Sequence, residues 1–142
     1  MQILQPPGWA EPKGYANGIL ARGELVFVAG QVGWDDTGTF RAQDFVGQVR
    51  QCLENTLAVL SEAGAGSEHV ARMTWYITDR EEYLSNLEGM GLAYRELMGR
   101  HFPTMTMVEV GALIELEAMV EVETTAVVPI EPSERPLSRR VY

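Results

Sequence analysis

The stretch Leu25-Val-Phe-Val-Ala-Gly-Gln-Val-Gly-Trp34 predicts a strand of β-branched and aromatic residues that is interrupted at Gly30. Both alternating sets of its side chains are apolar, whereas a strand on a solvated surface normally shows one polar face. We therefore expect both faces to be covered, one of them by helices. The glycine indicates a bend, or a point at which a ligand or another backbone comes close. We predict that this end of the strand forms one wall of a small-molecule pocket.

Length and composition predict one folded domain. The chain has 142 residues, a hydrophobic fraction of 46% and a formal net charge of -9, which is enough for a sizeable core. The acidic balance argues against nucleic acid as a partner, because phosphate backbones are bound by clusters of Lys and Arg. The chain shows no leader sequence and no apolar run that could span a membrane, so we expect a soluble cytoplasmic protein. The single cysteine, Cys52, is expected to be a buried apolar residue.

Apolar periodicity and turn residues predict the remaining elements. Helices are expected at 44–63 and 79–99, and further strands at 19–22, 70–78, 104–110 and 118–128. Asp79 and Glu82 have the spacing of a capping box for the second helix. The side chains expected to face the core are Phe45, Val49, Cys52, Leu53, Thr56 and Leu60 in the first helix, Tyr83, Leu87, Met90, Tyr94 and Leu97 in the second, and Ala71, Met73, Trp75 and Ile77 in the strand at 70–78.

This order of elements predicts an α+β fold with two helices packed on one face of a sheet. The other face of the sheet still carries apolar residues, and an uncovered apolar patch of that size normally marks an interface. We therefore expect a homo-oligomer. The domain is expected to span residues 1–128. Residues 129–142 contain three prolines and form a predicted C-terminal tail.

Several segments, taken in order, resemble the RidA/YjgF family, which is also called the reactive-intermediate deaminase or endoribonuclease L-PSP family. They are Val26-Phe-Val-Ala-Gly-Gln31, Gln51-Cys-Leu-Glu-Asn55, Met73-Thr-Trp-Tyr-Ile-Thr-Asp79, Tyr94 nine residues before Pro103, Val108-Glu-Val110, and Ala118-Met-Val-Glu-Val-Glu123. The resemblance covers roughly residues 15–128. It implies a chorismate-mutase-like fold, a homotrimer with pockets at the subunit interfaces, and cofactor-free hydrolysis of enamines or imines to ketones and ammonia.

One position departs from the family pattern. Typical members hold the substrate carboxylate with an arginine directly after Pro-Ala, whereas this chain reads Pro103-Thr104-Met105-Thr106. Methionine cannot supply the charge or the paired donors of a guanidinium, and losing such a hydrogen bond costs about 1.5–3 kcal/mol. We therefore expect a pocket without a fixed cation, suited to a larger or less charged substrate such as a 2-aminomuconate-type enamine. The alternative is a metabolite-binding or regulatory trimer without turnover.

The resemblance also assigns candidate site residues. Glu121 matches the first glutamate of the family's Val-Glu-Ile-Glu motif, and its implied role is to position or activate water, which suits a general base. The expected substrate-binding residues are Tyr15, Gly30, Trp34, Tyr94, Thr104, Met105 and Thr106. His101 has two interpretations, as a pocket residue or as a residue at a helix C-terminus that interacts with the helix dipole. Trp75 is interpreted as core packing. The sequence contains no predicted metal site.

Overall fold

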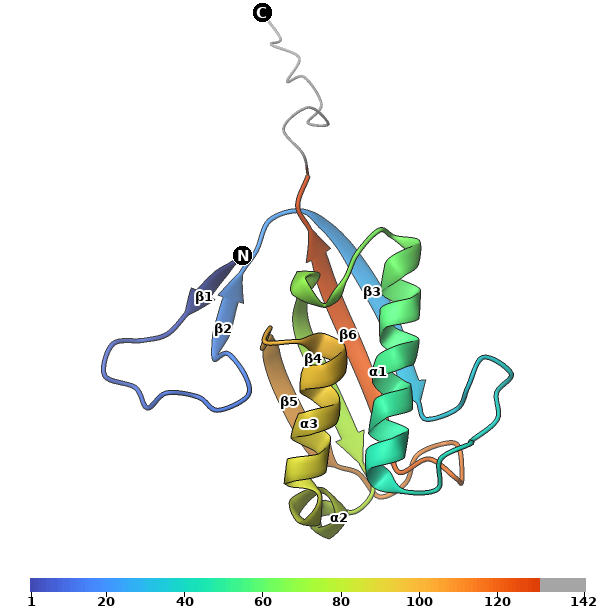
Figure 1. Cartoon of the computed structure of the whole chain (residues 1–142). Coiled ribbons are helices and arrows are strands. Elements are labelled where there is room, and N and C mark those ends of the chain that lie inside the picture. The colour runs from blue at the N-terminus through green and yellow to red at the C-terminus, as the bar shows by residue number, and fades with distance from the viewer. Residues whose placement is uncertain (131–142) are drawn as a thin grey trace, which may run out of the picture.

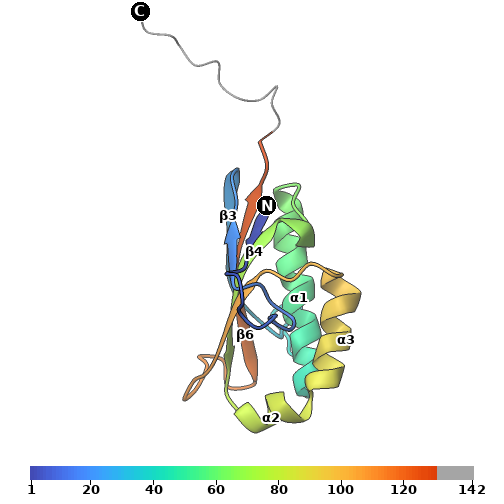
Figure 2. The ribbon, with the colours of Figure 1, turned by 90° about the vertical axis from the view of Figure 1, so that its left-hand side faces the viewer.

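The computed structural model describes residues 1–130, so the predicted tail at 129–142 lies almost entirely outside the described residues. Four strands form a mixed sheet in the order β3-β6-β4-β5, in which β5 runs parallel to β4 and the other pairs are antiparallel. Two long helices, α1 and α3, lie against one face of this sheet (Figures 1 and 2). The predicted α+β class is confirmed.

The elements begin and end as follows: β1 Gln2–Leu4, β2 Gly18–Leu20, β3 Glu24–Val32, α1 Phe45–Glu62, β4 Val70–Ile77, α2 Arg80–Ser85, α3 Leu87–Met98, β5 Thr104–Glu109 and β6 Val120–Val128. A short 3-10 helix at Ser67–His69 leads into β4. No helix within residues 1–130 is long and apolar enough to cross a membrane.

Helix α1 confirms the prediction for 44–63 almost residue for residue. Asp44 caps its N-terminus by accepting a hydrogen bond from the amide of Gly47. Gly64, with a φ of 65°, follows its C-terminus, where a left-handed residue closes a helix without strain. Every residue of the predicted stripe is buried, including Cys52. Burial raises the pKa of the Cys52 thiol to about 12, so that side chain stays protonated and unreactive at neutral pH.

Gln48 is the residue of α1 that the apolar pattern misplaces. Periodicity sets it off the buried stripe, but its side chain is only 1% exposed. The amide nitrogen donates to the carbonyl of Glu117 at 2.8 Å, and the amide oxygen accepts from the backbone nitrogen of Met119 at 2.8 Å. A polar side chain is stable there because it satisfies backbone groups that would otherwise be buried without partners. Gln48 thus fastens α1 to the loop that precedes β6.

The second predicted helix is divided in two. Asn86 separates α2 from α3, with a φ of -121° and a ψ of 21° that no helix interior has. Its side-chain amide donates to the carbonyl of Glu82 at 2.7 Å, so it competes with the helical bonding pattern. Asp79 caps α2 as predicted, but Glu82 does not complete a capping box and instead accepts from Asn86 at 3.0 Å.

The N-terminal region also differs from the prediction. The strand expected at 19–22 is β2, and it pairs with β1 rather than with β3. These two strands form a separate antiparallel pair beside the main sheet (Figure 1). Gly23 lies between β2 and β3 with a φ of 151°, and its Cα lies against the carbonyl of Val128. The chain therefore changes direction at Gly23 and enters the main sheet only at β3.

Strand β4 keeps Met73, Trp75 and Ile77 in the core as predicted, but the pattern fails at its start. The register shifts between Val70 and Arg72, where β4 pairs with β6. This irregularity leaves Val70 fully buried and Ala71 only half-buried, because an extra residue reverses which side chain faces inward.

Within residues 1–130 no element covers the face of the sheet away from the helices, and this face carries apolar side chains along β3 and at the end of β5 beside polar ones on β4 and β6. Leu25 is 59% exposed and Phe27 is 72% exposed, both on β3, and Val108 on β5 is also exposed. Their neighbours Val26 and Val28 pack against the core. The prediction that helices cover one face of this strand is confirmed, and the other face carries uncovered apolar side chains.

We predict that Gln48→Leu lowers the free energy of unfolding by about 2–4 kcal/mol. A leucine fills the same space, but it leaves the amide of Met119 and the carbonyl of Glu117 buried without partners. Gln43→Leu is the matched control, because Gln43 is an exposed glutamine that precedes α1 and bonds neither Glu117 nor Met119. Urea denaturation of the two variants measures the difference. Equal stabilities would show that the Gln48 hydrogen bonds contribute nothing.

Candidate functional site

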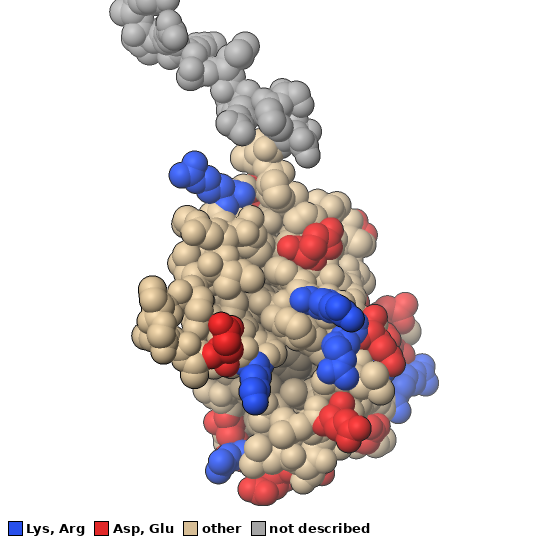
Figure 3. Space-filling view, turned by 60° about the vertical axis from the view of Figure 1, so that its left-hand side comes forward, with Lys and Arg blue, Asp and Glu red and all other residues tan. Residues whose placement is uncertain are grey.

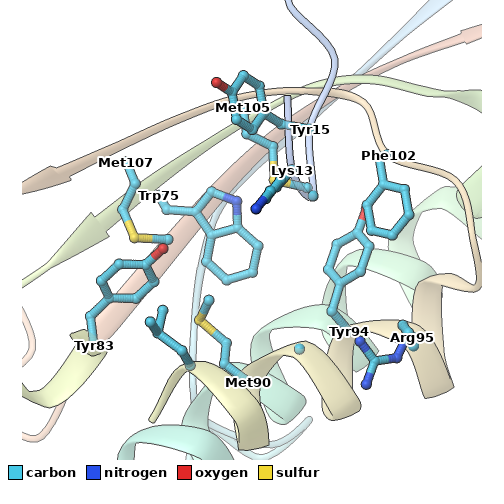
Figure 4. Close-up of a pocket in the computed structure, with 13 residues that line it drawn as sticks. Lys13, Tyr15, Trp75, Tyr83, Met90, Tyr94, Arg95, Phe102, Met105 and Met107 are labelled. Carbon is cyan, nitrogen blue, oxygen red and sulfur yellow. The ribbon is translucent and has the colours of Figure 1, made fainter. Parts of the chain in front are cut away.

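A cavity of about 540 Å³ lies between β5 and α3, on the helix-covered side of the sheet. We call it the β5 cavity. Its volume falls in the range of small-molecule sites. Aromatic and methionine side chains make up most of its wall (Figure 4). Its lining residues are Lys13, Gly14, Tyr15, Trp75, Tyr83, Leu87, Met90, Gly91, Tyr94, Arg95, Phe102, Met105 and Met107.

Strand alternation and helix α3 place the walls of this cavity. Met105 and Met107 pair with Met73 and Trp75 of β4, so the side chains of all four point to the helix-covered face. Opposite them, Tyr94 of α3 is buried and donates a hydrogen bond to the carbonyl of His101 at 2.8 Å. Burial holds the pKa of the Tyr94 phenol well above its usual value. The phenol therefore remains neutral and acts as a fixed donor.

The ring of Phe102 stacks on Tyr94, with ring centroids 5.7 Å apart and ring planes 15° apart. The predicted stripe of the second helix runs into this region, where Tyr83 and Met90 are only partly buried and Leu87, which was expected to face the core, is 49% exposed. Their exposure has a simple cause, since they line the cavity rather than pack against the sheet.

The N-terminal segment supplies the third wall. The amide of Ala16 donates to the carbonyl of Pro103 at 3.0 Å, and Ala16 forms a parallel bridge with Thr104 at the start of β5. This pairing brings Lys13 and Tyr15 to the mouth of the cavity (Figure 4). A segment far from β5 in the sequence thus lies beside it in the fold.

The charge around this cavity is opposite to that of the whole chain. Lys13 and Arg95 both line it, and no aspartate or glutamate does within residues 1–130. Figure 3 shows basic side chains on both sides of the hollow in this face, with acidic side chains farther out beside them. The expectation of a pocket without a cation is therefore wrong, although Met105 does stand where the family's arginine is expected. A cavity of this charge favours an anionic ligand.

Trp75 contributes an unpaired donor. Its side chain is 2% exposed, and its indole nitrogen has no hydrogen-bond partner within residues 1–130. A buried donor without a partner costs about 1–3 kcal/mol. The interpretation of Trp75 as core packing is therefore incomplete, because the same ring is part of the cavity wall.

Glu121 lies elsewhere, in a shallower cavity of about 380 Å³ that we call the outer cavity. Its lining residues are Gly30, Tyr76, Val110, Ala112, Leu113, Ile114, Glu121 and Glu123. The pairing of β3 with β6 shifts register between Val28 and Gln31, around Gly30, where the sequence indicates a bend or a close approach. The carboxylate of Glu121 lies over Gly30, at the position that a Cβ would occupy. Gly30 is therefore required for the close approach of a side chain.

The two cavities lie on opposite faces of one sheet. Trp75 and Tyr76 are neighbours on β4, and one lines the β5 cavity while the other lines the outer cavity. Met105 and Glu121 are separated in the same way. The single chain thus brings together Tyr15, Tyr94 and Met105 in one place and Gly30 with Glu121 in another.

The other predicted site residues line neither cavity. Trp34 packs against Phe40 with ring centroids 5.9 Å apart. The Thr104 hydroxyl donates to the carbonyl of Ala71 at 2.7 Å, and Thr106 is exposed. The side-chain Nε2 of His101 lies 2.6 Å from the carbonyl of Val70, so it joins the end of α3 to β4 instead of facing a ligand. No group of three or more potential metal ligands occurs within residues 1–130.

Sequence reasoning missed several cavity residues, chiefly Lys13, Tyr83, Arg95 and Met107. One signal was available, because Lys13 is the only lysine of the chain and lies two residues before Tyr15. The others required knowledge of how α3 sits over β5.

Comparison with known proteins gives consistent matches. Residues 10–128 match the family described as Endoribonuclease L-PSP. A RutC family protein of Pyrococcus abyssi is 34% identical over 115 residues, which are 77% of this chain and 87% of that protein. The Escherichia coli protein named "Putative reactive intermediate deaminase TdcF" is 31% identical over 131 residues, 89% of this chain and 95% of that protein.

Solved structures give the same fold. A Rid family protein of Yersinia pestis, YyfB, superposes with a TM-score of 0.79 at 26% identity, over 89% of this chain and 98% of that chain. The structure of Escherichia coli TdcF with bound serine superposes with a TM-score of 0.63 at 30% identity, over 90% of this chain and 99% of that chain.

We predict that Gly30→Ala lowers the free energy of unfolding by about 1–2 kcal/mol, because its methyl group overlaps the Glu121 side chain and forces it aside. The loss should be smaller when Glu121 is also changed to alanine, so the two substitutions should be non-additive. Gly111→Ala is the control, since a Cβ there meets nothing within 4 Å. Thermal unfolding of the four variants measures the coupling. Strict additivity would contradict the close approach of these two residues.

Proposed function

This chain belongs to the endoribonuclease L-PSP family, which includes the RidA/YjgF proteins, and we propose that it is a cofactor-free deaminase of enamines or imines. The observation that carries the proposal is the retained pair of Glu121 and Gly30, whose contact holds a carboxylate at the wall of the outer cavity. The name of the related TdcF of Escherichia coli supports the same reaction class.

We propose that the complete site is assembled in a homotrimer. Hydrolysis needs the water-activating carboxylate within hydrogen-bond reach of the reacting carbon's water, and one chain keeps Glu121 and Met105 on opposite faces of its sheet. A neighbouring copy that meets the outer face with its β5 edge would bring its own β5 cavity to Glu121. The exposed apolar side chains Leu25 and Phe27 on that face support this assembly.

The β5 cavity favours a substrate larger than the three-carbon imino acids. A small acid would leave most of about 540 Å³ unfilled. Of the two properties expected of the substrate, the cavity volume favours the larger size, and the cations Lys13 and Arg95 disfavour a lower charge. A planar, acidic enamine of the 2-aminomuconate type satisfies both requirements.

In the proposed reaction, the β-carbon of the enamine first takes a proton from solvent, which gives the protonated C=N group, and Glu121 then takes a proton from a water molecule whose oxygen attacks the carbon of that group. The resulting carbinolamine carries one hydroxyl and one amino group on that carbon. The carboxylic acid of Glu121 returns its proton to the amino nitrogen, the C–N bond breaks, and ammonia leaves while the hydroxyl becomes the ketone after loss of its proton. Water is the only co-reactant.

The alternative is a metabolite-binding or regulatory trimer without turnover. Met105 in place of the family's arginine favours it, because the position that fixes the substrate carboxylate has lost its charge. The same cavities would then bind a ligand without consuming it. A ribonuclease activity, which the family description carries, is disfavoured by the net charge of -9.

We predict that Glu121→Gln reduces ammonia release by about 10²–10⁴-fold, which is the usual contribution of a general base. The assay follows ammonia from enzymatically generated 2-aminomuconate and, in parallel, 2-aminoacrylate, with the spontaneous rate subtracted. Glu54→Gln is the matched control, because Glu54 is an exposed glutamate of α1 that lines neither cavity.

Equal rates for Glu121→Gln and the unsubstituted protein would remove Glu121 from the reaction. Saturable binding of 2-aminomuconate with ammonia release no faster than the spontaneous rate would favour the regulatory trimer.

We further predict a solution species with three times the mass of one chain, measured by sedimentation equilibrium. Phe27→Arg should weaken its assembly, because a charge replaces an apolar side chain that is 72% exposed in the single chain. Leu84→Arg on α2 is the control, since Leu84 is an exposed apolar residue on the helical side. A monomer for the unsubstituted protein would contradict the shared site.

A further inference from the structure

We propose that Lys13 and the indole N–H of Trp75 together bind the carboxylate of an aromatic or similarly planar, apolar acid in the β5 cavity. The inference rests on the proposed function in one respect, because it takes this cavity as the substrate site. Lys13 and Trp75 would thus fix the ligand in a chain whose β5 carries Met105 instead of the family's arginine.

The first observation is that Lys13 lies beside β5. Lysine is a cation at neutral pH, and the pairing of Ala16 with Pro103 and Thr104 holds the segment that carries Lys13 beside β5. Lys13 and Met105 both line the cavity. Lys13 of the N-terminal segment can therefore supply to this cavity the positive charge that β5 lacks at Met105.

Trp75 supplies the second, independent observation. Its indole nitrogen is buried, lacks a partner within residues 1–130, and belongs to a side chain of the cavity wall. Figure 4 shows this nitrogen turned toward Lys13. Both groups are donors, so neither can satisfy the other. A carboxylate has two acceptor oxygens and can accept from both at once.

The rest of the cavity selects the body of the ligand. Rings of Tyr83, Tyr94 and Phe102 and the thioethers of Met90 and Met107 form walls with few polar atoms. Flat apolar groups pack well against aromatic faces, and methionine adapts to their shape. A planar, unsaturated carbon body with a carboxylate at the end that meets Lys13 and Trp75 fits this combination.

The test uses 3-phenylpropionate, which has no C=N bond and cannot be turned over. Isothermal titration calorimetry compares it with 3-phenylpropionamide, a neutral analogue of the same shape, and with acetate, which lacks the ring. The unsubstituted protein should bind 3-phenylpropionate and bind the other two at least about tenfold more weakly, because one lacks the charge and the other the apolar body.

Substitution of Lys13 identifies the cation. Lys13→Gln should weaken binding of 3-phenylpropionate about tenfold or more, while Lys13→Arg should retain it because the charge remains. Arg22→Gln is the matched control: it also removes one positive charge, from an exposed residue that lines neither cavity. Equal binding by Lys13→Gln and the unsubstituted protein, or equal binding of the acid and the amide, would overturn the proposal.

Nuclear magnetic resonance tests the role of Trp75 with a signal that a purely structural role would not change. Its indole N–H resonance, assigned by comparison with Trp75→Phe, should shift on addition of 3-phenylpropionate, while those of Trp9 and Trp34 stay in place. The absence of that shift at saturation, or the absence of binding by the unsubstituted protein, would also overturn the proposal.

These measurements separate the inference from the proposed function. Lys13-dependent binding without ammonia release from any enamine would leave the ligand class intact and refute the deaminase. Ammonia release that depends on Glu121, together with Lys13-independent binding, would do the reverse.

Discussion

The site depends on the alternation of side chains along a sheet that helices cover on one face only. Neighbouring residues of β4 and β6 therefore face opposite compartments: Trp75 and Val122 face the helices, and Tyr76 and Glu121 face away from them. This constraint gives the chain an apolar, cation-bearing cavity on one side and a carboxylate over a glycine on the other. It also leaves the apolar side chains Leu25 and Phe27 of the outer face uncovered by any element within residues 1–130.

Most of the fold can be predicted from local patterns, whereas several residues that line the β5 cavity cannot. The stripe of α1, its cap at Asp44 and the bulge at Gly30 follow from short-range rules of periodicity and backbone freedom. The burial of Gln48 and the helix break at Asn86 were not predicted, for one shared reason. Each side chain donates a hydrogen bond to a backbone carbonyl, and apolar periodicity does not reveal such bonds. Lys13 was missed because its position depends on a long-range pairing with β5.

Family resemblance and structure answer different questions about this chain. The resemblance identifies Glu121 and the missing arginine at Met105, but it assigns both to one pocket. The structure places them on opposite faces and shows that the β5 cavity retains positive charge from Lys13 and Arg95. Loss of the family's arginine therefore does not leave the cavity electrically neutral. Thr104 and Thr106, which alternate with Met105, face away from that cavity and cannot substitute for the guanidinium.

The attachment of the N-terminal segment has a consequence for access to the β5 cavity. Its link to the main sheet includes the single backbone hydrogen bond from Ala16 to Pro103, whereas each strand of the sheet is held by a full ladder. One such bond contributes only about 0.5–1.5 kcal/mol, and the bridge to Thr104 extends the contact by a single residue, so we expect the segment to detach more readily than a strand of the sheet. Such detachment would widen the entrance to the cavity, and reattachment would return Lys13 and Tyr15 to its wall.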